Sequence, residues 1–542
     1  MKKYFLENKL NIFVVILCNF IYVVAIGGMP FITKLLFDYD FTQDLGGMIW
    51  IILLYLLAAL IGMGAQYYTQ TFGWRVERDI KISMKHDLFS SMTYYSYPTF
   101  DTESVSSYVS TLENDVDVVV RQYVFPVLEM IQQSTQVIVY ATYLFFLDYR
   151  LAIVIILASC LTVKIPDLTA GEFSKRKSDH QKGIGKYMTV ANDLLVGFKA
   201  INYQTRQSII KHHDETLVET EEKLYRFGTF KAFTIVLTGA AMYGVNIVSY
   251  GMLGVLFAMK QITKGQGAAA LQYIDNFGYP VAYLLEYYGM VCSSRDVRNR
   301  LVEIINEKGT SQGAIHPTLK SKIEFKNVGV EFEKFELGPI NLNFEKGKKY
   351  ALIGHSGSGK STILSLLMQY IQLSKGRILV DGQLLQSIEA SSLMLCLNQA
   401  EPLFLGSFEE NISVFGSYET SSLSNWINRA NCDRLTHVAA KESCDSLSGG
   451  EKQLVNLVKS LMSQRDVLLL DESFSALDPQ TKIKMYDLIY QLKEQLVISV
   501  THDTSEQHLS CFDEVIVFSN GQVVAQGSYQ SLSQNHLLNF AI

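Results

Sequence analysis

The fold of this chain is decided by the stretch Gly354-His355-Ser356-Gly357-Ser358-Gly359-Lys360-Ser361-Thr362. An apolar run, 350–353, precedes it, and another, 363–367, follows it. The pattern therefore predicts a strand, a glycine-rich loop and a helix, which is the context that the phosphate-loop pattern G-x-x-x-x-G-K-[ST] requires. Glycines let backbone N–H groups surround an anion, and the helix N-terminus adds partial positive charge. The stretch predicts a nucleotide-binding site, with a plain glycine turn as the alternative.

The chemistry of this motif gives two of its side chains specific roles. Lys360 is expected to reach the β- and γ-phosphates of a nucleotide, and the hydroxyl of Ser361 is expected to hold Mg²⁺. The predicted ligands of this motif are therefore a nucleotide and Mg²⁺.

A second stretch, Val467-Leu468-Leu469-Leu470-Asp471-Glu472, predicts a buried strand that ends in two carboxylates. In phosphate-loop ATPases the first such Asp supports Mg²⁺. The adjacent Glu472 is placed to polarise an attacking water molecule. A buried strand that merely ends in surface acids is the alternative interpretation.

Short strand and helix patterns fill the rest of the chain from about residue 322. The segments 323–325, 328–332 and 340–344 alternate apolar and polar residues as strands do. We therefore predict an α/β phosphate-loop ATPase domain over 322–542, a linker over 306–321 and a different domain over 1–305.

The first 305 residues contain long apolar runs of the length that a membrane-spanning helix needs, about 20 residues. Six candidate spans are predicted, and the fold class of this half is an all-α transmembrane domain. The spans are about 10–37, 48–70, 122–147, 150–166, 231–259 and 267–292. The first run is too long for the apolar core of a cleavable signal.

Charge asymmetry predicts how these spans are oriented. Acidic residues without Lys or Arg lie between the first two spans, which indicates the outside: Asp38, Asp40 and Asp44. Basic residues lie in the two long segments that follow the second and fourth spans, which indicates the inside: Arg75, Arg78, Lys81, Lys85, Arg121, Lys175, Arg176, Lys177 and Lys182. Both termini and the ATPase domain are thus expected in the cytosol of a protein of the cytoplasmic membrane. The two long inner segments have helical spacing, which predicts that the membrane helices continue into the cytosol; independent surface helices are the alternative.

Polar side chains within the predicted spans are candidates for a substrate path. Ionisable groups are costly there and mark functional sites by default; they are Glu129, Asp275 and Glu286. Tyr279, Tyr283 and Tyr287 recur on one helix face and could line a cavity for an amphipathic or cationic substrate. Helix packing or an interfacial aromatic belt explains these tyrosines equally well.

Composition excludes some other classes of function. The chain has 47 basic and 53 acidic residues, a net charge of −6, which gives no support for nucleic-acid binding. Its seven cysteines form no C-x-x-C pair, so a disulfide framework or zinc site is not expected.

At this point the chain resembles an ATP-binding cassette (ABC) exporter half-transporter of the type I fold, over essentially its whole length. Leu447-Ser448-Gly449-Gly450-Glu451 is similar to the signature motif LSGGQ, and Ser475-Ala476-Leu477-Asp478 to the D-loop. Gln399 resembles the Q-loop glutamine, His502 the switch histidine, and Phe332 the aromatic residue that stacks on adenine.

The resemblance implies a role for each matching residue. The ATP-binding residues would be Phe332, Gly354, His355, Ser356, Gly357, Ser358, Gly359, Lys360, Ser361, Thr362, Gln399, Ser448, Gly449, Gly450, Glu451 and Asp478. The Mg²⁺ ligands would be Ser361, Gln399 and Asp471, and the catalytic residues Glu472, His502 and Lys360. The signature motif would contact the γ-phosphate of ATP held by a second chain. Segments at about 112–118 and 200–208 would be the coupling helices that dock on cassettes.

Several positions depart from the family pattern. Glu451 replaces the usual Gln of the signature motif, and Lys452 replaces the usual Arg after it. The acidic-glycine stretch before the signature motif is reduced, with Glu442 as its best match. None of these changes removes Lys360 or Glu472, so the ATPase machinery is expected to be complete.

The predicted function is ATP-driven export across the membrane by alternating access, as a dimer with two ATPs between two cassettes. The partner is a second half-transporter chain, identical or related, and the substrate is a peptide, drug or lipid-like molecule. No protease domain precedes the first span, so a peptide substrate would not be processed by this chain. An ATP-gated channel or membrane sensor on the same fold is the alternative, since fold does not fix function. A soluble ATPase and an importer are disfavoured.

Overall fold

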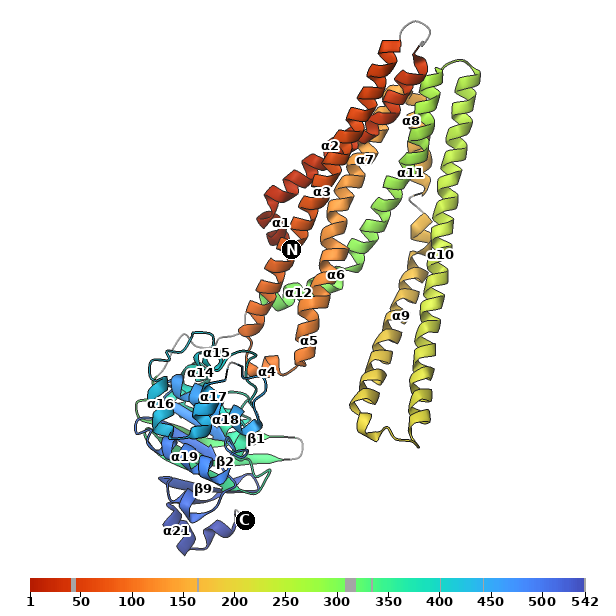
Figure 1. Ribbon diagram of the computed structural model, residues 1–542. Coiled ribbons are helices and arrows are strands. Elements are labelled where there is room, and N and C mark those ends of the chain that lie inside the picture. Colours follow the sequence, from red (N-terminus) through yellow and green to blue (C-terminus); the bar gives the residue numbers. More distant parts are fainter. Residues whose placement is uncertain are drawn as a thin grey trace. The chain divides into compact units, whose positions relative to one another are not determined.

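The computed structural model describes residues 1–39, 45–162, 165–307, 318–332, 335–399, 401–441 and 443–540. The chain forms two compact units, which we describe separately (Figure 1). The first unit comprises Met1–Ser90 and Val105–Glu307, and the second comprises Ser91–Ser104 and Lys308–Ile542. The second unit thus includes a short segment that lies, in the sequence, within the first.

The first unit is helical in its described residues. Its helices are α1 (Lys2–Glu7), α2 (Lys9–Asp38), α3 (Leu45–Thr93), α5 (Val105–Ser110), α6 (Val116–Val119), α7 (Phe125–Leu147), α8 (Tyr149–Thr162), α9 (Ile165–Val196), α10 (Arg206–Ala258), α11 (Lys264–Ser293) and α12 (Arg295–Asn306). Two π-helical turns, Thr111–Asp115 and Val120–Val124, join α5, α6 and α7 into one helical run. The all-α prediction for this half is confirmed.

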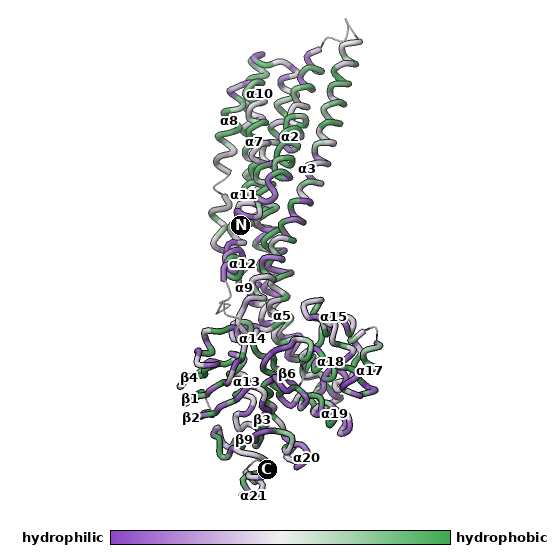
Figure 2. The backbone as a smooth tube through the Cα atoms, turned by 90° about the vertical axis from the view of Figure 1, so that its left-hand side faces the viewer, coloured by the Kyte–Doolittle hydropathy of each residue, from purple (hydrophilic) through white to green (hydrophobic). Residues whose placement is uncertain are grey.

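Three described helices are long and apolar enough to cross a membrane, namely Lys9–Asp38, Gly46–Thr93 and Arg206–Ala258. The other three predicted spans lie in α7, in α11 and in α8, where Tyr149–Ser159 is a shorter apolar helix. Figure 2 shows hydrophobic residues along α2 and part of α3. The 49 residues of α3 and the 53 of α10 extend about 74 and 80 Å at 1.5 Å per residue, far more than a hydrocarbon core of about 30 Å.

Two apolar clusters hold the described part of this unit together. In one cluster, side chains at every fourth position of α3 pack on α6 and on the π-helical turn that follows α6. The α3 residues are Val76, Ile80, Met84 and Leu88, and their partners are Val116, Val119, Val120 and Val124. In the other, α7, α8, α10 and α11 meet around Leu144, Leu151, Leu253, Tyr273 and Phe277. Helix α2 packs against α7 and α11, and α9 against α10.

The prediction that residues 112–118 form a coupling helix that docks on a cassette is wrong. This segment lies inside the α5–α7 run of the first unit, where Val116 is fully buried against α3. Lys81 Nζ lies 2.8 Å from Asp117 Oδ1, and Lys85 pairs with Glu113, which fixes the segment on α3. The helical spacing at 105–124 thus reflects packing on α3. The segment at 200–208 forms the turn between α9 and α10, and its docking stays a prediction.

The segment of the first half that belongs to the second unit contains the short helix α4 (Tyr97–Phe100). Ser96 caps this helix by accepting a hydrogen bond from the backbone N–H of Thr99. The ring of Tyr97 packs on that of Tyr370, with the ring centroids 4.3 Å apart. An aromatic contact therefore joins α4 to the nucleotide-binding half.

The rest of the second unit alternates strands and helices. The strands are β1 (Lys322–Glu331), β2 (Glu336–Glu345), β3 (Lys349–Gly354), β4 (Lys375–Val380), β5 (Gln383–Leu384), β6 (Met394–Leu397), β7 (Val467–Asp471), β8 (Leu496–Val500), β9 (Glu514–Ser519) and β10 (Gln522–Gly527). The helices are α13 (Lys360–Leu367), α14 (Ala390–Leu393), α15 (Phe408–Ser413), α16 (Leu423–Ala430), α17 (Asp433–Ala439), α18 (Gly449–Met462), α19 (Pro479–Tyr490), α20 (Glu506–Leu509) and α21 (Tyr529–Gln534). The predicted α/β class is confirmed.

Two sheets organise this unit. An antiparallel sheet has the order β2-β1-β4-β5, and a mixed sheet has the order β10-β9-β3-β8-β7-β6. Within the mixed sheet, β6, β7, β8, β3 and β9 run parallel, and β10 pairs antiparallel with β9. Helix α13 contributes Ile363 and Leu367 to the apolar core that both sheets share. Helices α15 to α19 cover a second core on the mixed sheet.

This topology explains where a site forms. The carboxyl ends of parallel strands meet at one edge of a sheet, where α/β proteins bind ligands. Strands β3, β8, β7 and β6 are consecutive neighbours, so the residues that follow them emerge side by side. These are the glycine-rich loop, His502, Asp471 with Glu472, and Gln399.

Candidate functional site: a nucleotide-binding edge

The glycine-rich loop leaves β3, a strand whose six residues are all buried, and enters α13. The Nζ of Lys360 donates to the carbonyl oxygens of Gly354 and His355, both at 2.8 Å. Burial lowers the pKa of this amine, while Glu472 and Asp471 act in the opposite direction. The lysine is thus folded back over the loop, a position from which its ammonium can turn to an anion held in the loop.

Space as well as backbone conformation favours glycine at two positions of the loop, most strictly at Gly354, where the obstacle is a backbone atom. Gly354 has φ +147°, and a Cβ there would lie 2.2 Å from the carbonyl oxygen of Phe518. Gly359 has φ +101°, and its Cβ would lie 2.4 Å from Leu337 Cδ1. Gly357, at φ +78°, faces open space, so only its backbone conformation favours glycine. The loop backbone is therefore free to surround an anion, as the motif requires.

The predicted Mg²⁺ ligands Ser361 and Asp471 are brought together. Ser361 Oγ donates to Asp471 Oδ1 at 2.9 Å. Burial raises the pKa of Asp471, and the neighbouring charge of Glu472 raises it further. A bound cation would stabilise the ionised form of this buried carboxylate, because its charge offsets the loss of hydration.

Glu472 and His502 lie against each other beyond the ends of β7 and β8. His502 Nε2 is 2.8 Å from Glu472 Oε1, and the backbone N–H of Glu472 donates to the carbonyl of Val500 at 3.2 Å. Glu472 has φ +49°, a left-handed conformation that few non-glycine residues adopt and that costs about 1–3 kcal/mol. Strain of this kind concentrates at functional sites, and here it turns the carboxylate toward the imidazole.

Gln399, predicted as a Mg²⁺ ligand, follows β6 at the same edge but does not contact the Ser361–Asp471 pair in this structure. Its Nε2 donates to Ser475 Oγ at 3.1 Å. Gln453, which the sequence did not single out, donates from Nε2 to the backbone carbonyl of Gln399 and accepts from the N–H of Ala476. The Q-loop and the D-loop are thereby linked through the signature helix.

The signature residues form the N-terminus of α18. Ser448 caps the helix, since its Oγ accepts from the N–H of Glu451 while its own N–H donates to Glu451 Oε2 at 2.8 Å. Two further cations, absent from the sequence prediction, complete the group. Lys441 Nζ lies 2.8 Å from Glu451 Oε1, and Arg434 donates to both Ser448 Oγ and Asp478 Oδ2 at 3.3 Å.

The remaining predicted residues lie at the periphery. His355, Ser356 and Gly357 are exposed at the turn of the loop, and Thr362 is half-buried in the first turn of α13. Gly449 and Gly450 follow Ser448 in α18, where a Cβ on Gly450 would meet the carbonyl oxygen of Ala476 at 2.8 Å. Phe332 is 42% exposed beside Phe335, at a ring-centroid distance of 6.1 Å. Glu442 lies outside the described residues.

The residues at the sheet edge fit a nucleotide with a divalent cation. Ser358 Oγ is buried in the loop and has no hydrogen-bond partner in the part of the chain that the structure describes. A buried hydroxyl without a partner is costly, and a phosphate oxygen would supply one. The hydroxyl and carboxylate of Ser361 and Asp471 are oxygen ligands, which Mg²⁺ prefers.

Comparison with known proteins agrees with this geometry. Residues 337–475 match the family model described as ABC transporter, and residues 10–280 match the one described as ABC transporter transmembrane region. The chain belongs to the ABC transporters. The order of the two matches, a membrane domain fused ahead of an ATPase domain, is the one predicted for an exporter half-transporter.

Relatives and a solved structure extend over most of this ABC transporter. A probable multidrug resistance ABC transporter ATP-binding/permease protein of Bacillus subtilis is 24% identical, over 91% of this chain and 76% of that protein. An ATP-dependent lipid A-core flippase of Saccharophagus degradans is 22% identical, over 91% and 86%. A bacterial Atm1-family ABC exporter with ATP bound has a TM-score of 0.81 at 18% identity, covering 98% of this chain and 96% of its own. This chain is an ATP-hydrolysing transporter with the exporter fold.

The polar residues predicted for the substrate path of this transporter lie on α7 and α11. Glu129 is half-buried on α7, and Glu286 is exposed on α11. Asp275 accepts a hydrogen bond from the hydroxyl of Tyr250 of α10. Tyr283 stacks on Tyr287, with ring centroids 6.2 Å apart. Tyr279 is exposed, so the three tyrosines are not packed away together.

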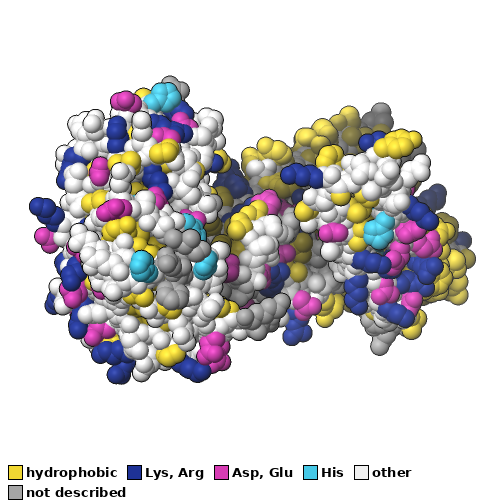
Figure 3. Space-filling model, turned by 90° about the horizontal axis from the view of Figure 1, so that it is seen from below, with side chains coloured by type: hydrophobic (Ala, Val, Ile, Leu, Met, Phe, Trp, Pro, Cys, Tyr) yellow, Lys and Arg dark blue, Asp and Glu magenta, His cyan; other side chains and the backbone are white. Residues whose placement is uncertain are grey.

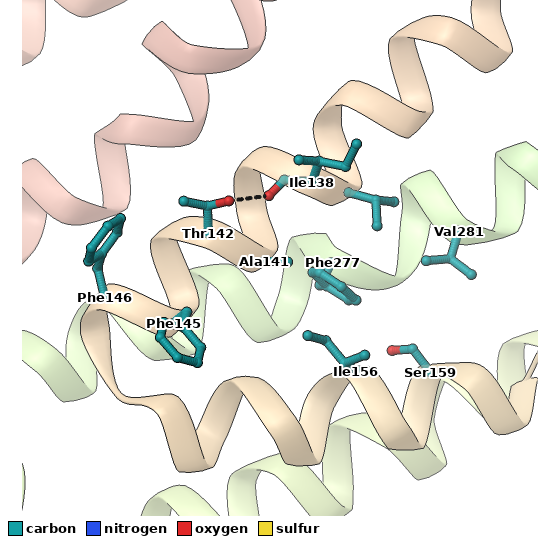
Figure 4. Close-up of a pocket in the computed structure, with 10 residues that line it drawn as sticks. Ile138, Ala141, Thr142, Phe145, Phe146, Ile156, Ser159, Phe277 and Val281 are labelled. Atoms are coloured by element: carbon teal, nitrogen blue, oxygen red, sulfur yellow. Dashed lines mark hydrogen bonds between the residues drawn. The ribbon is translucent and has the colours of Figure 1, made fainter.

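A cavity of about 540 Å³ lies among α7, α8 and α11 of the transporter, and apolar side chains line it almost throughout (Figure 4). Phe145 and Phe146 lie at one end, and Phe277 and Ile156 extend into the space between helices. The hydroxyl of Thr142 donates to the carbonyl of Ile138 at 2.7 Å and so offers little polarity to the cavity.

Proposed function

We propose that this chain exports its substrate as one half of a dimer, in which two ATPs are bound between two cassettes and power alternating access. The observation that carries the proposal is the meeting of Lys360, Asp471, Glu472 and His502 at one sheet edge, in a chain whose other half is a bundle of long helices. Phosphoryl transfer needs positioned charges more than covalent chemistry, and this edge provides them.

The residues would divide the work as follows. The loop N–H groups and Lys360 bind the phosphates, and Phe332 stacks on the base. Ser361, Asp471 and, after rearrangement, Gln399 hold Mg²⁺, which when bound neutralises charge on the phosphate oxygens. Glu472 accepts a proton from the attacking water, and His502 orients the Glu472 carboxylate. Ser448, Gly449, Gly450 and Asp478 face the ATP of the partner chain.

We propose that the transporter lies in the cytoplasmic membrane with both termini and the cassette in the cytosol. Basic residues on the α9–α10 hairpin, such as Lys175 and Lys177, support this orientation, while Asp40 and Asp44 of the opposite loop lie outside the described residues. The domain boundaries proposed are 1–305, 306–321 and 322–542. Figure 3 shows acidic and basic side chains mixed over the visible faces.

For the substrate we propose a chemical class. The apolar cavity on α7, α8 and α11 favours a drug or lipid-like molecule, in keeping with two relatives, a probable multidrug transporter and a lipid A-core flippase. A peptide is the remaining member of the predicted set. The partner is an identical chain or a related half-transporter.

The Mg-ATPase rate of the chain alone, reconstituted in lipid, tests the proposal beside Glu472→Gln. Turnover that this substitution abolishes supports a self-sufficient homodimer. Well-folded protein that binds ATP without turnover would require a different partner chain. An ion current through protein locked with ATP would favour the channel alternative instead.

A further inference from the structure

The signature end of this cassette carries a carboxylate where the motif usually carries a neutral amide. Glu451 is largely buried, with a side chain 13% exposed, and it is held from two sides. Its Oε2 accepts from the N–H and Oγ of Ser448, both at 2.8 Å, and its Oε1 pairs with Lys441 at 2.8 Å. Every oxygen of the carboxylate is thereby engaged within the chain.

This arrangement has an electrostatic consequence for any anion that approaches α18. A helix N-terminus attracts anions through its partial positive charge, and a fixed carboxylate there opposes the attraction. Among the residues that the structure describes, the charged side chains bonded to Ser448 or to these partners are Glu451, Lys441, Arg434 and Asp478, two of each sign. Without Lys441 the group would carry a net negative charge at the end that should receive a phosphate.

We propose that Lys441 is a positioning residue that neutralises Glu451 and turns it away from the partner chain's ATP, so that Ser448 and the N-terminus of α18 can bind the γ-phosphate. The inference rests on the proposed function, because it needs an ATP shared between two chains. The pair Lys441–Glu451 thus replaces, by charge compensation, what a neutral Gln does in the usual motif.

The pair also affects how easily the Ser448 hydroxyl can change its hydrogen-bond partner from Glu451 to a phosphate. Its hydroxyl donates to Glu451 and accepts from Arg434, so it must release Glu451 before it can donate to a phosphate. A carboxylate already bound by Lys441 releases the hydroxyl more easily than an unpaired one, because Lys441 still offsets its charge.

The test is steady-state ATP hydrolysis by the full chain in lipid nanodiscs, with four variants: Lys441→Met, Lys441→Arg, Glu451→Gln and the double variant Lys441→Met/Glu451→Gln. Lys441→Met is expected to raise the KM for ATP about fivefold, the scale of one charge at a helix end, with little change in kcat. Lys441→Arg keeps the wild-type KM. The double variant returns KM to within about twofold of the wild type, since both charges are gone.

Two results would overturn the inference. One is an unchanged KM in Lys441→Met, and the other is a Lys441→Met defect that Glu451→Gln does not rescue. A lower Tm without rescue would show that Lys441 only stabilises the fold. If the wild type alone binds ATP but shows no turnover, a different partner chain is required, and the same variants are measured with that partner co-expressed. If no partner chain gives turnover, the proposed function fails, and this inference falls with it. If the wild type is active and Lys441→Met equals it, the inference alone fails.

Discussion

His502 Nε2 lies 2.8 Å from Glu472 Oε1, and this contact joins the residues that follow two neighbouring parallel strands, β8 and β7. The register of the strands sets the pairing, since Asp471 stands beside Val500, with Glu472 one residue and His502 two residues beyond these positions. The left-handed backbone of Glu472 completes the geometry. A carboxylate oriented in this way is suited to accept a proton from water.

Glu472→Gln should keep ATP binding and lower ATP turnover about a hundredfold or more, because an amide cannot accept the proton. His502→Ala should lower turnover as well, by releasing the Glu472 carboxylate from its fixed position. Turnover is measured as phosphate release, and binding with a fluorescent ATP analogue. Turnover of Glu472→Gln near the wild-type rate would contradict the assignment.

Gly354→Ala should destabilise the cassette more than Gly357→Ala does. Both positions have positive φ, but only the Cβ at residue 354 would meet a backbone atom, the carbonyl oxygen of Phe518 at 2.2 Å. We expect Gly357→Ala to cost about 1 kcal/mol, and Gly354→Ala about 2 kcal/mol or more, because β3 or β9 must shift. Thermal unfolding of the nucleotide-free chain gives the comparison, and equal Tm values would refute the close approach of the loop to β9.

The local motif could be predicted from the sequence, whereas the contacts that depend on tertiary structure could not. The loop 354–362 and the strand end at Asp471 and Glu472 are short patterns, because binding phosphate and Mg²⁺ requires particular residue types at fixed spacing along the chain. Arg434 and Lys441 lie in a segment without such a pattern, and only the fold brings them to Ser448 and Glu451. Sequence periodicity could not assign them a partner.

The prediction of a coupling helix at 112–118 shows a different limit. The four residues of α4 are too few to show periodicity, whereas the residues at 105–124 have a strong helical pattern. That pattern has a structural cause, since Val116, Val119 and Val120 are fully buried on α3. A helical stripe reports which face is buried but not which neighbour buries it.

The stability that Glu451 contributes should depend on pH in a defined direction. The hydrogen bond and charge of Lys441, with the N–H and hydroxyl of Ser448, lower the pKa of this carboxyl to about 2 from its ordinary 4.5. The ionised form is therefore favoured by the fold, so its contribution is fully present above the unfolded value and is lost as pH falls from about 4.5 through about 2.

The difference in Tm between the wild type and Glu451→Gln measures this contribution. It should be constant from about pH 7 to 5.5 and shrink steadily below about pH 4.5, because the glutamine variant lacks the titrating group. Glu506→Gln, a change in the first turn of the separate helix α20, serves as a control. A Tm difference that grows on acidification would show that the carboxylate is not stabilised by the fold.

Tyr97→Ala should weaken the link between the cassette and the chain that leads to the membrane helices, since Tyr97 packs on Tyr370 with ring centroids 4.3 Å apart. Burial raises the pKa of Tyr370 to about 12, which agrees with a phenol covered by neighbouring groups. Loss of an aromatic pair costs about 0.5–1.5 kcal/mol beyond the buried area, too little to unfold the cassette. We therefore expect ATP binding to survive while stimulation of ATPase activity by added drugs or lipids is reduced.

Tyr94→Ala, at an exposed tyrosine of the same segment, is the matched control. Equal stimulation in the wild type and both variants would exclude α4 from the coupling path, whereas a defect confined to Tyr97→Ala places it there.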